Sequence, residues 1–403
     1  MSISRRSQFE FVALMAALMS IVALALDALL PALEPIGETI QSRSTADNQL
    51  LITLFFLGLG VGPLFFGPIS DSVGRKPVVY IGFAMFILSS VVCVFAQSVE
   101  VMVIGRILQG VSLSAPRTIS IAMIRDIYSG DYMARIMSFV TVVFILVPVI
   151  APALGKYILD QMGWQAIFHV QVGFSILVCW WFWKRQPETL PPRRRSSFRG
   201  RIFVAGFKEL LNYRQTVAFT FIWGFITGSF LVYLSTSQQI FEQQYGLPDS
   251  FPYLFAALAI TIGAATLLNG TLVVRLGMLK LVTVSMILYV LTSLVYIVLY
   301  YNTGNPPVIV LMIFFAVQFF AVGFIFGNLR ALAMEPLGHI AGIGAAITGF
   351  VATVMAVPIS AFIGKFVLTS VLPMFVGFLV CGIISCLILG YFYYSKSGIR
   401  ARY

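Results

Sequence analysis

Long apolar runs separated by short polar segments cover the chain from end to end. A helix that crosses a lipid bilayer needs about 20 predominantly apolar residues, and these runs reach that length repeatedly. The pattern therefore predicts about twelve membrane-spanning helices. We place them at residues 10–33, 49–70, 77–96, 101–124, 135–160, 164–184, 215–238, 251–273, 280–301, 307–328, 340–363 and 371–394.

The composition supports a membrane protein. Of the 403 residues, 59% are hydrophobic and only 10% are charged, whereas soluble domains carry roughly 25% charged residues. A membrane β-barrel needs short segments of alternating polarity, but the apolar runs here are long and continuous. We therefore expect an all-α polytopic membrane protein.

The net charge of +11 is unevenly placed along the chain. Basic residues gather in alternate connecting segments, at Arg75, Lys76, Arg125, Arg135, Arg193, Arg194, Arg195, Arg199, Arg201, Arg275, Lys280, Arg330, Lys396, Arg400 and Arg402. Because basic loops stay on the cytoplasmic side, both termini are predicted to be cytoplasmic. We expect the arginines to meet anionic lipid headgroups, and we do not expect nucleic acid as a partner.

The longest polar stretch divides the chain into two halves. We predict a six-helix bundle at 1–186, a cytoplasmic linker without a folded domain at 187–213, and a second six-helix bundle at 214–403. A repeat supports the division, because two glycines seven residues apart, Gly67 and Gly74, recur 203 residues later as Gly270 and Gly277. Paired repeats of this kind are typical of secondary transporters.

The segment after the second predicted span reads GPISDSVGRKP. Gly67 and Gly74 allow close helix approach and a sharp turn. Asp71 can pair with a cytoplasmic arginine or accept from a helix N-terminus, and Arg75 and Lys76 hold the loop at the membrane surface. A well-packed basic turn would explain the same residues, but this order of glycines, acid and bases resembles the signature of the major facilitator superfamily. In that family the loop latches the outward-open state. The second half has Val274 at the position equivalent to Asp71, so its latch would be weaker.

Two further motifs narrow the resemblance. They comprise Arg106, Gln109 and Gly110 in the fourth span, and Pro148, Pro152 and Gly155 in the fifth. The first set is similar to a motif of drug–proton antiporters. The second is similar to their antiporter motif, although Ala151 stands where a glycine is common, and plain helix packing remains an alternative.

Four stretches resemble the bicyclomycin/chloramphenicol-resistance branch of the family. They read DALLPAL at 27–33, RDIY at 125–128, GWQAIF at 163–168 and EPLGHIAG at 335–342. The resemblance implies a major facilitator fold of twelve helices and a proton-driven multidrug exporter in the inner membrane of a bacterium. We expect it to act as a monomer on small molecules, with a proton gradient and no metal or other cofactor.

Ionisable residues inside a span are costly and mark functional sites. Asp27 in the first span and Arg106 in the fourth lie at similar depths, roughly 8–9 Å below the outer end of their spans at about 1.5 Å per residue. We therefore expect a direct or water-linked pair. Because a carboxyl group can lose its proton and arginine in practice cannot, Asp27 is the predicted proton carrier and Arg106 its modulator. A static structural pair is the alternative.

Arg117, after Pro116 in the fourth span, departs from the branch, which usually has an apolar residue there. Three roles stay open: contact with an anionic or carbonyl-bearing substrate, an inner gate with a carboxylate or helix end, or a side chain that reaches the headgroups.

The second half lacks equivalent charges, since the same offset matches Asp27 to Phe230, Arg106 to Ile309 and Arg117 to Phe320. We therefore expect proton chemistry in the first half and substrate contact in the second. The candidate substrate contacts are Phe230, Tyr233, Gln238, Gln318, Phe319 and Asn328, each of which ordinary packing would also explain.

The sequence contains no nucleotide-binding motif and no nucleophile beside an oriented base, so an ATP-driven pump and a membrane enzyme are not expected. Proton-coupled export of small organic molecules by alternating access is the main hypothesis. The alternative is a dedicated transporter for one anionic metabolite, such as a carboxylate, siderophore or amino acid.

Overall fold

The computed structural model describes residues 8–195 and 200–400. The chain forms two compact units, Met1–Arg199 and Gly200–Tyr403. We call them the N-terminal unit and the C-terminal unit and describe each by itself.

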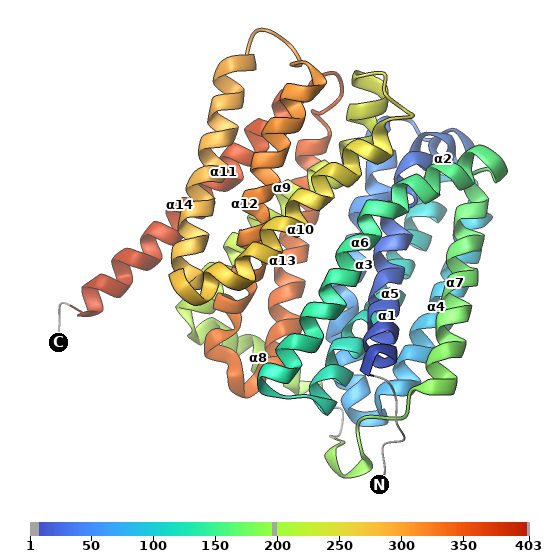
Figure 1. Cartoon of the computed structure of the whole chain (residues 1–403), viewed down its shortest axis with the longest axis vertical. Coiled ribbons are helices and arrows are strands. Elements are labelled where there is room, and N and C mark those ends of the chain that lie inside the picture. Colours follow the sequence, from blue (N-terminus) through green and yellow to red (C-terminus); the bar gives the residue numbers. More distant parts are fainter. Residues whose placement is uncertain (1–7, 196–199, 401–403) are drawn as a thin grey trace. The chain divides into compact units, whose positions relative to one another are not determined.

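The N-terminal unit is a helical bundle (Figure 1). Its elements are α1 (Gln8–Asp27), η1 (Leu30–Ala32), α2 (Leu33–Thr39), α3 (Thr45–Val73), α4 (Arg75–Val94), α5 (Val99–Ile127), α6 (Gly130–Met162), α7 (Trp164–Arg185) and η2 (Pro192–Arg194). Helix α5 packs against both α3 and α4, and α1 packs against α5, α6 and α7. Residues Asp27 and Arg106 therefore belong to neighbouring helices.

The C-terminal unit is also a helical bundle. Its elements are α8 (Arg201–Asn212), α9 (Arg214–Gln238), η3 (Gln239–Gln244), α10 (Phe251–Leu276), α11 (Met278–Tyr300), α12 (Val308–Met334), η4 (Glu335–Ile340), α13 (Ala341–Gly364) and α14 (Leu372–Arg400). Helix α9 packs against α12, α13 and α14.

The expectation of an all-α polytopic membrane protein is confirmed. Across the described residues, twelve helices have 20 residues or more. Ten segments are long and apolar enough to cross a membrane, and one of these, Val308–Gly364, contains both α12 and α13. The remaining long helix is α6.

The predicted first span, residues 10–33, lies within the apolar segment Gln8–Thr39, but its helix is interrupted. Helix α1 stops at Asp27, and a turn and a short 3-10 helix carry the chain into α2. Pro31 has no backbone N–H, so it cannot donate to the carbonyl of Asp27 four residues earlier. The N–H of Leu29 donates to Leu26 instead of Ala25. The break therefore leaves the Ala25 carbonyl without its helical partner, inside the bundle.

The linker is more ordered than the sequence predicts. Within the predicted linker 187–213, the chain forms η2 and the twelve-residue helix α8. Helix α8 packs against α13. The hydrophobic spacing within 201–212 is therefore a helical pattern that the composition-based linker assignment overlooked.

Candidate functional site

Asp27 is the last residue of α1 and only 4% of its surface is exposed. Among the described residues, no hydrogen bond or ion pair joins its carboxyl to Arg106. The prediction of a direct pair is therefore wrong for this structure. A link through water stays a prediction.

Arg106 on α5 is fully buried, with 0% of its surface exposed. Its Nε donates to the carbonyl of Leu51 at 3.1 Å, and its Nη1 donates to the carbonyl of Ala25 at 3.1 Å. The ring of Phe55 lies under the guanidinium, 4.4 Å from its central carbon. The arginine therefore binds the end of α1 through a backbone oxygen two residues before Asp27.

Gln109 and Ser90 complete this network. Nη1 of Arg106 donates to Oε1 of Gln109 at 2.7 Å, and Nε2 of Gln109 donates to the hydroxyl of Ser90 at 2.8 Å. The Nη2 atom of Arg106 is buried and has no partner among the described residues. One guanidinium nitrogen thus remains able to bind a water molecule or a rearranged Asp27.

Two motif glycines place backbones in direct contact around this site. A Cβ atom at Gly110 would overlap the carbonyl of Phe55 on α3, and a Cβ at Gly155 would overlap the backbone of Ala28. Only glycine allows such an approach. In the same motif as Gly155, Pro152 is buried and Pro148 is half-buried. The fifth-span motif therefore contacts the break that follows Asp27.

Gln171 on α7 is a site residue that sequence reasoning missed. It is 1% exposed, its Nε2 lies 3.4 Å from the carbonyl of Leu24, and its Oε1 has no partner within the described ranges. A buried amide in an otherwise apolar span is the signal that would have found it.

The loop between α3 and α4 forms a second site in the N-terminal unit. Arg75 is the centre of this site: its Nη1 bonds Asp71 at 2.5 Å and Ser70 at 2.7 Å, and its Nε bonds Asp126 at 2.9 Å. Gly74 has a φ of 110°, which favours glycine. Asp126, from the RDIY stretch after the fourth span, was not singled out as a partner of Arg75.

Glu188, in the chain that follows α7, caps this loop. Its two carboxylate oxygens each accept from a backbone N–H of α4, from Arg75 and from Lys76, both at 3.0 Å. Burial raises the pKa of Glu188, but the N–H donors of Leu190, Lys76, Arg75 and Thr189 outweigh it, so the pKa lies below its usual value. This cap was missed because Glu188 is 112 residues from Lys76 in sequence.

Gly67 does not make the close helix contact that the sequence predicts. No heavy atom of another segment lies within 4 Å of where its Cβ would be. Gly58, nine residues earlier on α3, makes that contact instead, because a Cβ there would overlap the carbonyl of Ile107 on α5.

In the C-terminal unit, three of the candidate substrate contacts belong to one aromatic cluster. Tyr233 lies 4.5 Å from Phe319 and 6.2 Å from Phe230, measured between ring centroids. Tyr233 and Phe319 are buried, whereas Phe230 is half-buried. Phe319 also packs face to face with Phe315. The buried pair behaves as core, and Phe230 is the member with surface left for a ligand.

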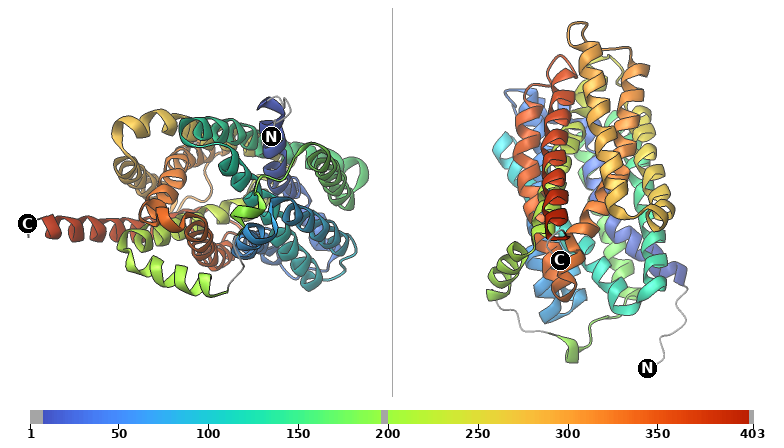
Figure 2. Two further views of the ribbon diagram at one scale, coloured as in Figure 1. Left: turned by 90° about the horizontal axis from the view of Figure 1, so that it is seen from below. Right: turned by 90° about the vertical axis from the view of Figure 1, so that its left-hand side faces the viewer.

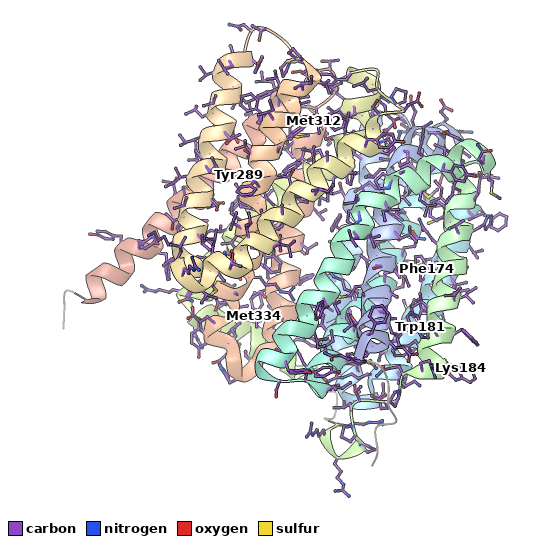
Figure 3. The ribbon with its side chains drawn as sticks, in the orientation of Figure 1. Phe174, Trp181, Lys184, Tyr289, Met312 and Met334 are labelled. Atoms are coloured by element: carbon purple, nitrogen blue, oxygen red, sulfur yellow. The ribbon has the colours of Figure 1, made fainter. Side chains whose placement is uncertain are left out.

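The three amide candidates are separated along the unit. Gln318 donates to Ser293 at 3.0 Å, Asn328 donates to Asn269 at 2.7 Å, and Gln238 pairs with Glu242. A further buried bond, 2.8 Å long, joins Tyr289 (Figure 3) to Ser229. The bonds of Gln318, Asn328 and Tyr289 join neighbouring helices, whereas the bond of Gln238 lies within the continuous helical stretch of α9 and η3. None of these bonds joins one amide candidate to another, and their grouping into one substrate site stays a prediction.

Arg117 is half-buried on α5, and the hydroxyl of Ser120 donates to its carbonyl at 2.8 Å. The three roles considered for the Arg117 side chain stay predictions.

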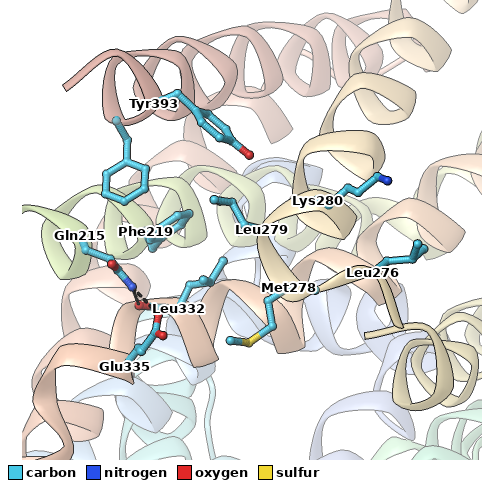
Figure 4. Close-up of a pocket in the computed structure, with 11 residues that line it drawn as sticks. Gln215, Phe219, Leu276, Met278, Leu279, Lys280, Leu332, Glu335 and Tyr393 are labelled. Carbon is cyan, nitrogen blue, oxygen red and sulfur yellow. Dashed lines mark hydrogen bonds between the residues drawn. The ribbon is translucent and has the colours of Figure 1, made fainter. Parts of the chain in front are cut away.

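A cavity of about 430 Å³ opens at the end of the C-terminal unit where α9 and α11 begin (Figure 4). Phe219 and Leu332 form apolar parts of its wall, and Gln215 donates to Glu335 across one side at 2.7 Å. Lys280 lines the opposite part (Figure 4). None of the residues predicted from sequence to bind substrate lines this cavity.

These features define a polytopic membrane protein of the transporter class. The sequence model of the Major Facilitator Superfamily matches residues 14–359. The chain belongs to this superfamily, whose members transport small molecules.

Known proteins agree with this assignment. The chain is 26% identical to the Bicyclomycin resistance protein homolog of Haemophilus influenzae over 403 residues, which is 99% of each chain. It is 26% identical to Multidrug resistance protein MdtL of Escherichia coli over 356 residues, 86% of this chain and 87% of that protein. These matches confirm the resemblance to the bicyclomycin/chloramphenicol-resistance branch.

Among solved structures, a D-xylose-proton symporter superposes with a TM-score of 0.74 at 16% identity, covering 94% of this chain and 97% of that one. At this identity, the likeness shows the fold alone.

Proposed function

We propose that this protein is a proton-driven antiporter that exports small organic molecules from a bacterial cytoplasm, with both termini cytoplasmic. It is not an enzyme, and it works as a monomer without a cofactor. The names of the relatives support export of drugs, since they are described as resistance proteins.

The proposal of proton coupling rests on one observation: Asp27 is buried and has no hydrogen-bonding partner among the described residues. Burying an ionised carboxylate without a partner costs several kcal/mol or more, whereas burying the neutral acid costs far less. Protonation of Asp27 is therefore linked to the state in which the end of α1 is closed around it. A state that hydrates this carboxyl favours release of the proton, and this difference couples the proton gradient to movement.

Arg106 modulates Asp27 through the helix end rather than by direct pairing. Its bond to the Ala25 carbonyl fixes the break in α1, and its unoccupied Nη2 offers a donor once the carboxyl is ionised. A substrate that reorients the end of α1 would thus change proton affinity without touching Asp27.

The test is drug efflux in everted membrane vesicles that contain Asp27→Asn. We expect loss of efflux driven by a pH gradient, whereas exchange of labelled drug for unlabelled drug persists, because the neutral amide mimics the protonated carrier. Glu34→Gln, which changes an exposed acid on α2, is the matched control. Full gradient-driven efflux by Asp27→Asn would refute the assignment.

A dedicated transporter for one anionic metabolite is the second candidate, and the half-buried cation Arg117 favours it. We then expect Arg117→Ala to abolish transport of anionic compounds and to spare neutral drugs. Equal transport of both classes by Arg117→Ala would remove the support for this candidate.

A further inference from the structure

Helix α8 has two apolar sides. One side packs against α13, where Gly206 is buried and a Cβ on it would lie 2.7 Å from the Ile343 side chain. The other side is a stripe of Val204, Phe207 and Leu211, which are 59%, 45% and 55% exposed. Their spacing of three and four residues puts them on one face of the helix. An exposed apolar stripe on a helix that is already anchored on another side requires an apolar environment.

The third side of α8 is polar. Asn212 is exposed there, and Glu209 binds the hydroxyl of Tyr213 and the ring of His339. Lys208 is exposed and lies one turn from Val204, on the edge of the apolar stripe. A helix with one protein side, one apolar side and one polar side fits the boundary between lipid and water.

The position of α8 agrees with this boundary. It ends at Asn212, and α9, which is long and apolar enough to span a membrane, begins at Arg214. The left view of Figure 2 looks roughly along the long helices of the C-terminal unit and shows α8 lengthwise, at the edge of that unit. With twelve residues, or about 18 Å at about 1.5 Å per residue, α8 is too short to cross a bilayer.

The basic sequence that precedes α8 favours anionic lipid. The sequence before it carries Arg193, Arg194 and Arg195, all exposed, and then Arg199 and Arg201. Basic residues next to an amphipathic helix attract anionic headgroups of the cytoplasmic leaflet.

We propose that α8 is an interfacial helix that inserts its Val204–Phe207–Leu211 stripe into the cytoplasmic leaflet and binds anionic phospholipid there. Because α8 packs against α13 at Gly206, the lipid composition of the leaflet acts directly on a membrane-spanning helix of the transporter. This proposal rests on the predicted orientation and is independent of proton coupling and of the substrate.

The experiment measures the environment of the stripe in the full-length protein. Phe207→Cys carries a nitroxide label, in a background whose native cysteines are replaced and whose drug efflux is retained. Asn212→Cys, on the polar side, is the matched control. Collision of each label with oxygen, which enters lipid, and with a water-soluble nickel chelate is compared in nanodiscs of phosphatidylcholine with and without phosphatidylglycerol.

We expect the label at 207 to collide several-fold more with oxygen than with nickel, the label at 212 to show the reverse, and the label at 207 to move deeper when phosphatidylglycerol is present. Equal nickel access at both sites would mean that the stripe faces water, and shielding from both reagents would mean that protein covers it. Either result overturns the proposal. A depth that ignores phosphatidylglycerol overturns the assignment of anionic lipid. Wild-type efflux in the labelled protein shows that such a failure belongs to this proposal and not to the proposed function.

Discussion

Arg106 binds the carbonyl oxygen of Ala25, and not the carboxyl of Asp27, through an Nη1–O distance of 3.1 Å. This bond is available because Leu29 donates to Leu26 and leaves the Ala25 carbonyl unpaired at the break of α1. The buried Arg106 thus stabilises the break at the end of α1, next to Asp27, the predicted proton carrier.

Removing Arg106 should therefore lower the folding stability of the protein as its primary effect, and any effect on proton transfer at Asp27 should be secondary. Arg106→Ala leaves the Ala25 carbonyl and the Gln109 amide oxygen without their donor, and each unsatisfied buried group costs about 1–3 kcal/mol. We expect a clear fall in the unfolding midpoint of the purified protein in detergent. Arg43→Ala, at an exposed arginine, should change stability by less than about 0.5 kcal/mol. Wild-type stability of Arg106→Ala would contradict the role in holding the break.

Gly155→Ala should damage the contact between α6 and the break. The added Cβ overlaps the backbone of Ala28, so one of the two segments must move, at a cost of about 1–3 kcal/mol. We expect reduced drug efflux and a lower unfolding temperature. Gly173→Ala on α7, where nothing lies within 4 Å of the new Cβ, is the matched control and should behave like the wild type. Equal behaviour of the two variants would disprove the close contact.

Glu188→Gln should weaken the cap on α4. The amide can no longer accept from both Arg75 and Lys76, and loss of a helix cap costs about 0.5–2 kcal/mol. The pKa of Glu188 is below its usual value, so its contribution is present above the pKa of the unfolded chain, about 4.3, and is lost as pH falls through the folded-state pKa. Unfolding measured from pH 7 down to pH 3 should show the two proteins converging at the acidic end. If the difference in stability between the wild type and Glu188→Gln stays constant over this pH range, the ionised carboxylate of Glu188 is not the source of the stabilisation.

Arg75 and Asp126 should be energetically coupled. Their side chains are 9% and 15% exposed, so the pair is largely protected from water. A double-mutant cycle with Arg75→Gln and Asp126→Asn should give a coupling free energy of about 1 kcal/mol or more in unfolding. Additive single effects would show that the ion pair contributes nothing. The family resemblance implies that the loop between α3 and α4 latches one conformation, and on that basis we also expect Asp126→Asn to slow drug efflux.

Phe319 and Phe230 should respond differently to the same change. Phe319 is 1% exposed within the aromatic cluster, so Phe319→Ala should cost about 3–5 kcal/mol of stability. Phe230 is half-buried, and Phe230→Ala should instead alter which drugs are exported while costing less stability. Drug susceptibility panels together with thermal unfolding separate these effects. A stability loss at Phe230 as large as that at Phe319 would assign both to the core.

The sequence by itself determined the all-α membrane fold and the family. A spanning helix must be apolar along about 20 residues whatever it packs against, so α9 at Arg214–Gln238 agrees closely with the predicted 215–238. The spacing of Asp71, Gly74 and Arg75 was equally informative, because residues in one turn interact locally: Arg75 does bond Asp71.

Only the tertiary structure decided which partners the buried polar groups take. Asp27 and Arg106 have similar depths, but pairing also depends on how each helix is rotated and on where α1 breaks, and neither follows from depth. Glu188 reaches α4 from a segment more than a hundred residues away. Such contacts depend on chain topology and on directional hydrogen bonds, which require positions in three dimensions, whereas burial in lipid requires only a run of apolar residues.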